Sequence, residues 1–194
     1  MPILGTVASQ FSGKAFGSFE SIATSSIGSD GTGTITFDSV PATFKHLQLR
    51  LIARTNRATV PGDYLKIKFN DDASSNYIQH SLSTSLADTP IRSDSDGVGT
   101  FIYGYHITSV SPYFSSSMYE ILEYRSTNKT KVIRGYTGQD SNANFVNGYN
   151  ASGVGFISAL WNNSSDPITK ITIQPVVGTV FVQYSHFALY GIKG

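Results

Sequence analysis

Apolar and polar residues alternate along most of the chain with a period of two. The alternation is clearest at 45–54, where Leu47, Leu49 and Leu51 fall on one side of the chain and mainly polar residues on the other, and it recurs at 63–70. This period places successive side chains on opposite faces of a strand, so it predicts half-buried β-strands. The predicted strands are 19–27, 33–37, 45–54, 63–70, 76–83, 99–108, 117–124, 131–137, 153–161, 168–174 and 179–192.

Turn-forming residues separate these strands at intervals typical of sandwiches and barrels. The longest expected loop is 85–97, which contains three aspartates and Pro90. Such a loop on a rigid sheet could carry recognition or could be a solvated connection. Because so many strands need two sheets or a closed barrel, we predict an all-β fold, and an antiparallel two-sheet β-sandwich in particular.

The first 18 residues do not share the alternating pattern. Their apolar residues, including Ile3, Leu4, Phe11 and Phe16, are interspersed with Gly, Ser and Thr and match no single period. We expect 1–18 to form an extended N-terminal arm before one domain at 19–194. The arm could pack along its own domain or reach a neighbouring subunit.

The last predicted strand has apolar residues on both faces. Val182, Tyr184 and Tyr190 point to one side, while Phe187 and Leu189 point to the other. The outward face of a strand in a lone sandwich should be polar. We therefore expect the arm, a long loop or a neighbouring subunit to cover this strand, which makes it a candidate assembly interface together with the apolar arm residues.

The chain carries few charges: 14% of its residues are charged and the formal net charge is +1. Nucleic acids and anionic membranes attract concentrated Lys and Arg, so neither is an expected partner. The absence of cysteine excludes disulfides and thiolate metal sites. Since neither a secretory signal nor a membrane-spanning apolar run is visible, we expect synthesis in a cytoplasm and no membrane insertion.

Residues suited to catalysis or metal binding are few and scattered. Glu120 and Glu123 would face opposite sides of a regular strand, so they are not a local acid/base pair. Asp94 and Asp96, within the acidic stretch 88–96, could join an irregular calcium site or form a plain acidic turn. The four histidines, which form no pair with metal-ligand spacing, are His46, His80, His106 and His186. We expect no catalytic residues, no metal and no cofactor, although a site assembled from distant strands would leave no local motif.

Aromatic residues offer an alternative, ligand-binding interpretation. Tyr103 and Tyr105 occupy alternate positions of one predicted strand and so share a face, where tyrosine rings can stack on sugars or fill an interface. Trp161 ends an apolar strand, where it could close the end of the sandwich or line a binding groove. Ordinary core packing is the competing explanation for all three residues.

Three parts of the chain carry a resemblance to a known group of proteins. They are GSFESIAT at 17–24, FKHLQLR at 44–50 followed by ARTN at 53–56, and VQYSHFALYGIK at 182–193. The chain resembles small structural proteins of tailed phages that infect marine bacteria and cyanobacteria, over nearly its whole length. The resemblance implies a β-sandwich of jelly-roll type and supplies no catalytic residue.

The resemblance also implies a function in the phage particle. The leading hypothesis is a non-enzymatic virion protein, a capsid decoration or cement protein that stabilises the head by contacting the major capsid protein or tail and fibre proteins. It is expected to form a homo-oligomer such as a trimer and to reside in the virion after synthesis in the host bacterial cytoplasm. The alternative is a fibre or receptor-binding module that recognises host-surface glycans, and a polysaccharide-degrading enzyme is a third hypothesis.

Overall fold

The computed structural model describes residues 18–58, 60–83, 92–140 and 152–194. Within these ranges the chain forms twelve strands. The same ranges contain no helix capable of crossing a membrane. The strands are β1 (Phe19–Ser26), β2 (Ile35–Phe37), β3 (His46–Ala53), β4 (Gly62–Phe69), β5 (Tyr77–Ser83), β6 (Arg92–Gly99), β7 (Ile102–Thr108), β8 (Ser115–Leu122), β9 (Lys131–Asp140), β10 (Ser152–Trp161), β11 (Ile171–Pro175) and β12 (His186–Ile192).

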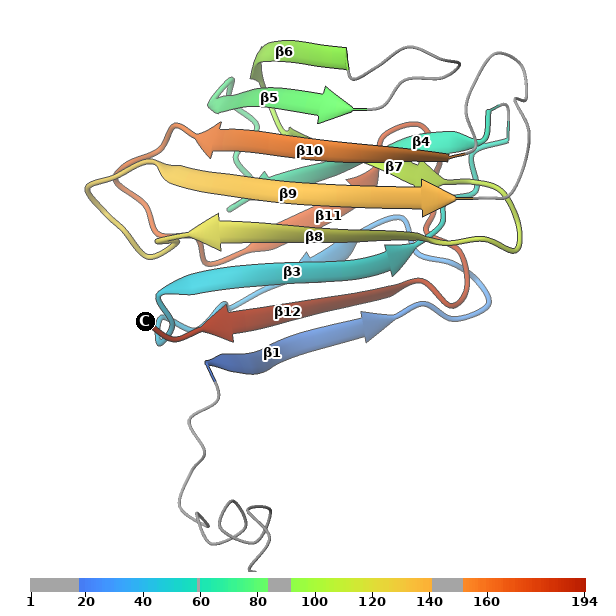
Figure 1. Ribbon diagram of the computed structural model, residues 1–194. Helices are drawn as coiled ribbons and strands as arrows, with labels where there is room; N and C mark the ends of the chain where they lie inside the picture. Colours follow the sequence, from blue (N-terminus) through green and yellow to red (C-terminus); the bar gives the residue numbers. More distant parts are fainter. Residues whose placement is uncertain (1–17, 59, 84–91, 141–151) are drawn as a thin grey trace, which may run out of the picture.

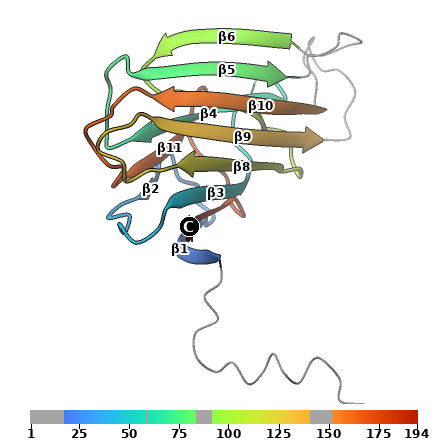
Figure 2. The same cartoon turned by 60° about the vertical axis from the view of Figure 1, so that its left-hand side comes forward.

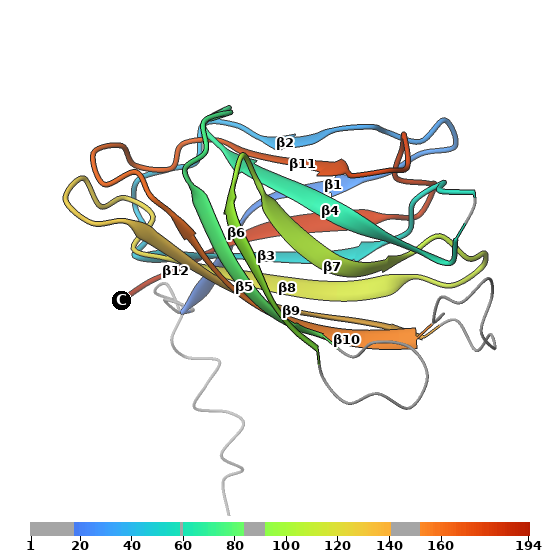
Figure 3. The same ribbon diagram turned by 90° about the horizontal axis from the view of Figure 1, so that it is seen from above.

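The strands form two antiparallel sheets. The larger has eight strands in the order β1-β12-β3-β8-β9-β10-β5-β6, and the smaller has four in the order β2-β11-β4-β7 (Figure 1). Figure 2 shows the larger sheet as one continuous stack from β6 to β1, and Figure 3 shows the two sheets as separate layers. The predicted all-β fold with two antiparallel sheets is thereby confirmed.

The hydrophobic core lies between the two sheets and follows from the alternation. In β3, Leu47, Leu49 and Leu51 are buried, whereas Arg50 and Ile52 on the opposite face are exposed. The smaller sheet contributes its own alternate apolar residues to the same cluster, and Leu65, Ile67 and Phe69 of β4 are among them. Burying these two apolar faces against each other holds the layers together.

Tyr119 of β8 bridges the space between the layers and depends on two glycines. A Cβ atom at Gly135 of β9 would lie 2.4 Å from a ring carbon of Tyr119, and one at Gly104 of β7 would lie 2.3 Å from its hydroxyl oxygen. Both distances are shorter than real Cβ contacts. The glycines therefore leave the volume that the fully buried Tyr119 ring occupies.

Trp161 closes one end of the sandwich, which is one of the two interpretations that the sequence allowed for this residue. Its ring is 1% exposed and packs 5.7 Å from the Phe69 ring, centroid to centroid. Its indole Nε1 donates to Asp72 Oδ2 at 2.8 Å. The fully buried ammonium of Lys131 lies 5.3 Å from the indole centroid and donates to the carbonyl oxygens of Asn163 and Asp166.

Two sequence predictions about loops and strands are wrong. Residues 92–97 of the expected loop 85–97 belong to β6, which begins at Arg92 and pairs with β5 along the edge of the larger sheet, and residues 85–91 lie outside the described part of the chain. Backbone pairing with β5 needs no apolar alternation, and charged residues suit an exposed edge, so the Ser- and Asp-rich composition did not reveal a strand. The positions of the Asp94 and Asp96 side chains lie outside the part of the chain that the structure describes.

The second wrong prediction concerns the strand expected at 179–192. Only His186–Ile192 form β12, because Tyr184 adopts a left-handed backbone with φ of 70° and Ser185 N–H donates to Val182 O at 3.1 Å. The chain turns there. Phe181, before the turn, forms isolated bridges with Thr32 and Thr55, so the apolar alternation continued across a break in the strand.

Candidate binding face

The larger sheet has an outer face, turned away from the smaller sheet, that carries an exposed apolar row. Met118 of β8, Tyr136 of β9, Phe156 of β10 and Leu82 of β5 are paired in register across four neighbouring strands. Tyr136 is 51% exposed and Phe156 53%. Successive cross-strand partners lie within contact distance of one another, so the four side chains form a continuous row.

A second row beside it adds Ile52 of β3 and Val154 of β10, which are also exposed. We call these six residues (Ile52, Leu82, Met118, Tyr136, Val154 and Phe156) the apolar band. Single exposed apolar residues are common on monomers, but a contiguous group across five strands is typical of an interaction surface.

Arg50 lies on the same face, beside the apolar band. Its guanidinium carbon is 5.0 Å from the centroid of the Tyr190 ring and 5.7 Å from that of Phe19. Its Nε donates to the side-chain oxygen of Gln48. Two rings and one hydrogen bond thus hold a planar cation whose remaining N–H groups stay available at an exposed position.

Arg54 continues the same face beyond the end of β3. Its guanidinium carbon is 5.0 Å from the Phe114 centroid, and its Nη1 is buried without a hydrogen-bond partner. Two nearby carboxylates form ion pairs with other cations: Glu120 with Arg134 at 3.0 Å and Glu123 with Lys129 at 2.9 Å. Within the described ranges, no ion pair neutralises Arg50 or Arg54.

Two adjoining hollows follow the middle of the outer face. The first, of about 530 Å³, is lined by Arg50, Ile52, Met118, Tyr136, His186 and Tyr190, among others. The second, of about 310 Å³, shares Met118 and Tyr136 with the first and extends past Glu120 and Arg134 to Phe156. We call the first hollow the Arg50 groove.

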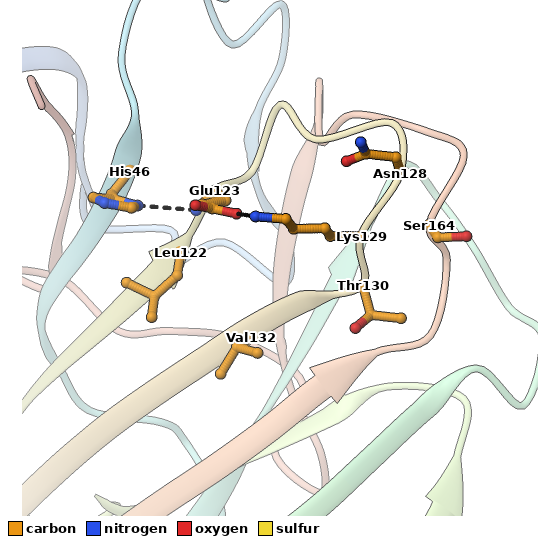
Figure 4. Close-up of a pocket in the computed structure, with 8 residues that line it drawn as sticks. All are labelled: His46, Leu122, Glu123, Asn128, Lys129, Thr130, Val132 and Ser164. Atoms are coloured by element: carbon orange, nitrogen blue, oxygen red, sulfur yellow. Dashed lines mark hydrogen bonds and ion pairs between the residues drawn. The ribbon is translucent and has the colours of Figure 1, made fainter.

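A third hollow, of about 630 Å³, lies where β8 ends and β9 begins (Figure 4). His46 Nδ1 accepts a hydrogen bond from Glu123 N–H at 2.9 Å, which places the proton of the neutral imidazole on Nε2. Burial, reinforced by the Lys45 charge, lowers the pKa of His46 below its ordinary value. The Lys129 ammonium bonds the carboxylate of Glu123 and lowers its pKa. The backbone N–H and the carboxylate of Glu123 are thus both bonded where β8 ends, to His46 and to Lys129.

The interface residues predicted on the last strand do not lie together in the structure. Tyr190 lies on the outer face under Arg50. Val182 and Tyr184 lie in the turn before β12, and Tyr184 is 74% exposed there. The assumption that all three share one strand face was wrong, because the turn interrupts the strand. The predicted arm residues Ile3, Leu4, Phe11 and Phe16 lie outside the described residues.

Two of the three predicted ligand-binding residues, Tyr103 and Trp161, have side chains that the structure describes. Trp161 is buried in the core, so its interpretation as a groove residue is wrong. Tyr103 lies on the outer face of the smaller sheet, partly buried between the rings of Phe101 and Tyr64. The β4–β7 pairing shifts register between the two ends of β7, so alternation does not establish a common face for Tyr103 and Tyr105. The Tyr105 side chain lies outside the described residues.

Sequence reasoning missed the apolar band. The signal was present at 131–137 and 153–161, where Tyr136, Val154 and Phe156 occupy the positions that alternation assigns to solvent. A strand with apolar residues of both parities indicates two covered faces.

The described ranges contain no group of three or more His, Asp or Glu side chains placed to hold a metal ion. Comparisons with protein-family models, with curated proteins and with solved structures find no match for this chain. The outer face of the larger sheet is therefore the candidate site, on the strength of its own geometry.

Proposed function

We propose that this protein is a non-enzymatic structural protein of a phage virion, most specifically a capsid decoration protein, and that it contacts other virion proteins through the outer face of its larger sheet. The observation that carries the proposal is the apolar band. Burying a large apolar side chain that is half exposed contributes about 1 kcal/mol, so the five exposed residues of the band, with the partly buried Met118, add a substantial stabilisation when repeated over many copies on a shell.

The strand order supports a jelly-roll architecture for this domain. Within the larger sheet β1-β12-β3-β8 are neighbours, and the smaller sheet is β2-β11-β4-β7. If β5, β6, β9 and β10 are set aside, the remaining eight strands follow the two interlocked Greek keys of a jelly roll, with the chain passing between the sheets at each end. Viral capsid proteins and lectins both use this architecture.

The four remaining strands support an added role for the larger sheet. β5 and β6 come between β4 and β7, and β9 and β10 come between β8 and β11. Both insertions extend the sheet beyond β8, and they carry Leu82, Tyr136, Val154 and Phe156 of the apolar band. The contact surface is thus built mostly on strands that the eight-stranded frame does not require.

The test is binding of purified protein to heads of its phage that lack it. We expect the wild-type protein to cosediment with these heads and to raise their resistance to heat. The double substitution Tyr136→Ser and Phe156→Ser should weaken binding by at least about tenfold, because it removes two large apolar contacts.

The matched control is Tyr64→Ser, which removes an exposed tyrosine from the smaller sheet and should bind like the wild type. Equal binding by the double variant, or heads that withstand heat equally well without the protein, would overturn the proposal. Light scattering of the free protein measures whether it is the homo-oligomer, such as a trimer, that this role includes.

The second candidate function is a fibre or receptor-binding module for host-surface glycans. The adjoining hollows along β8 and β9 favour it, because they contain aromatic rings and hydroxyl groups side by side. Such surfaces suit sugar rings, which have both apolar faces and polar edges.

A further inference from the structure

We infer that the Arg50 groove binds the carboxylate of an acidic sugar, as found in uronate-containing polysaccharides of bacterial surfaces. This inference rests on the second candidate function and names its ligand class. It requires the outer face of the larger sheet to be open to solvent, so it does not rest on the capsid contact proposed first.

The first step is the way Arg50 is presented. The Phe19 and Tyr190 rings and the Gln48 side chain fix the guanidinium before any ligand arrives. A planar guanidinium with free N–H groups matches the two oxygens of a carboxylate, and prior ordering reduces the entropy lost on binding.

The second step is the charge around the groove. Arg50 and Arg54 both lie on this face without an ion-pair partner in the described ranges, whereas Glu120 is held by Arg134. An anionic ligand would complete the charge balance. A second copy bound through the same face would instead oppose cation to cation, which disfavours a two-fold dimer at this position.

The third step is the remaining lining of the groove. Tyr136 and Tyr190 offer hydroxyl groups, and the His186 imidazole, whose Nδ1 lies 2.9 Å from Ser26 Oγ, offers its second nitrogen. Met118 and Ile52 supply apolar surface between them. This mixture fits a sugar ring, which needs partners for its hydroxyls and an apolar surface for its face.

The size and continuity of the hollows favour a saccharide over an acidic protein segment. A hollow of about 530 Å³ is within the range of small-molecule sites. The second hollow adjoins it through Met118 and Tyr136, so successive sugar units of one chain can occupy successive hollows.

The experiment is isothermal titration of the full-length protein with trigalacturonic acid, with its methyl ester, and with the neutral maltotriose. We expect the acid to bind at least about tenfold more tightly than the ester, because esterification removes the charge and leaves the sugar chain unchanged. Higher salt should weaken binding of the acid but not binding of the ester or of maltotriose.

The variants locate the site. Arg50→Gln should weaken binding of the acid at least about tenfold. Arg50→Lys should retain part of the affinity, because the positive charge remains but the planar group that can bond both carboxylate oxygens is lost. Lys66→Gln is the matched control, since it removes one positive charge from the opposite sheet and should change the affinity less than about twofold. Near-ultraviolet circular dichroism verifies that each variant is folded.

Each contrary outcome has a separate meaning. Equal affinity for all three saccharides, or an equal loss in Lys66→Gln, overturns the acidic-sugar inference and leaves a glycan-binding function standing. If none of the three saccharides binds at about 10 mM, both the acidic-sugar inference and the glycan-binding function are overturned. Tighter binding of a peptide of alternating Glu and Leu than of trigalacturonic acid assigns the groove to a protein partner and overturns the inference.

Discussion

At the scale of single residues, Asp72 connects the loop after β4 to Trp161 at the end of the sandwich. Burial on its own raises the pKa of this carboxyl, but hydrogen bonds from Asn76, Trp161 and Ser74 outweigh it and lower the pKa to about 2. The folded protein therefore binds the proton more weakly than the unfolded chain, whose carboxyl has a pKa of 3.8.

This difference predicts a loss of stability in acid. The contribution of Asp72 is fully present above about pH 4 and disappears as the pH falls through about 2, with a total of at most about 2 kcal/mol. Asp72→Asn should lower the free energy of unfolding at pH 7 and reduce its decline between pH 4 and 2. Urea titrations followed by Trp161 fluorescence measure both.

Asp71→Asn is the control for this prediction, because Asp71 is exposed and pairs with Lys170 at the surface. Its free energy of unfolding should stay within about 0.5 kcal/mol of the wild type at pH 7. A decline between pH 4 and 2 that is the same in Asp72→Asn and in the wild type would contradict the role given to Asp72.

The glycines of β9 allow a second comparison at this scale. Gly135→Ala should lower the free energy of unfolding by about 1–3 kcal/mol, because the new methyl group overlaps the Tyr119 ring in a closely packed core. Gly138→Ala, three residues along, places its methyl group in open space and should be neutral or slightly stabilising. Thermal unfolding of the two variants checks the difference, and similar melting temperatures would mean that Tyr119 moves aside without cost.

At the scale of elements, the turn before β12 departs most from the sequence expectation. Tyr184 has a left-handed backbone, which costs a non-glycine residue about 1 kcal/mol, and a ring that is 74% exposed. Strain at an exposed aromatic residue is typical of positions retained for contact. Asparagine tolerates this conformation better than tyrosine.

We therefore expect Tyr184→Asn to raise the free energy of unfolding by up to about 1 kcal/mol. Tyr64→Asn, on strand β4, should lower it, because the ring packs against Tyr103 and asparagine is a poor strand residue. Chemical denaturation of both variants makes the comparison. A destabilised Tyr184→Asn would show that the tyrosine ring forms contacts within the domain that outweigh the strain.

How far the sequence predicts the elements depends on whether their signal is local. β3 and β4 could be predicted because one face is apolar and the other polar, so alternation alone defines them. β6 could not, because its pairing with β5 is a backbone interaction that leaves no side-chain pattern. The break before β12 was hidden because the turn is held by backbone hydrogen bonds with a residue distant in sequence: Tyr184 N–H donates to Ile27 O, and Ile27 N–H donates to Ser185 O.

At the scale of the whole molecule, the sequence predicts two layers of strands but not which strands lie next to each other within a layer. Alternation implies two apolar faces packed together, yet it does not reveal that β8 lies between β3 and β9. The apolar band depends on that order, because its row joins residues from 82 to 156 across four strands. The Arg50 groove likewise unites β12, β3, β8 and β9. Such sites arise from strand order, which local patterns do not record.

The widening of the larger sheet has a consequence for how such a protein can diverge. β5, β6, β9 and β10 all lie at one side of β8, and the inner faces of β5, β9 and β10 contribute to the same core as the smaller sheet, with Tyr77, Ile133 and Ile157 among the buried residues. Because side chains of a strand alternate between its two faces, substitutions at the outward positions of these strands can alter the outer surface without changing the core. Descendants of one ancestor can then keep the same scaffold while the outer face of the larger sheet changes its chemistry.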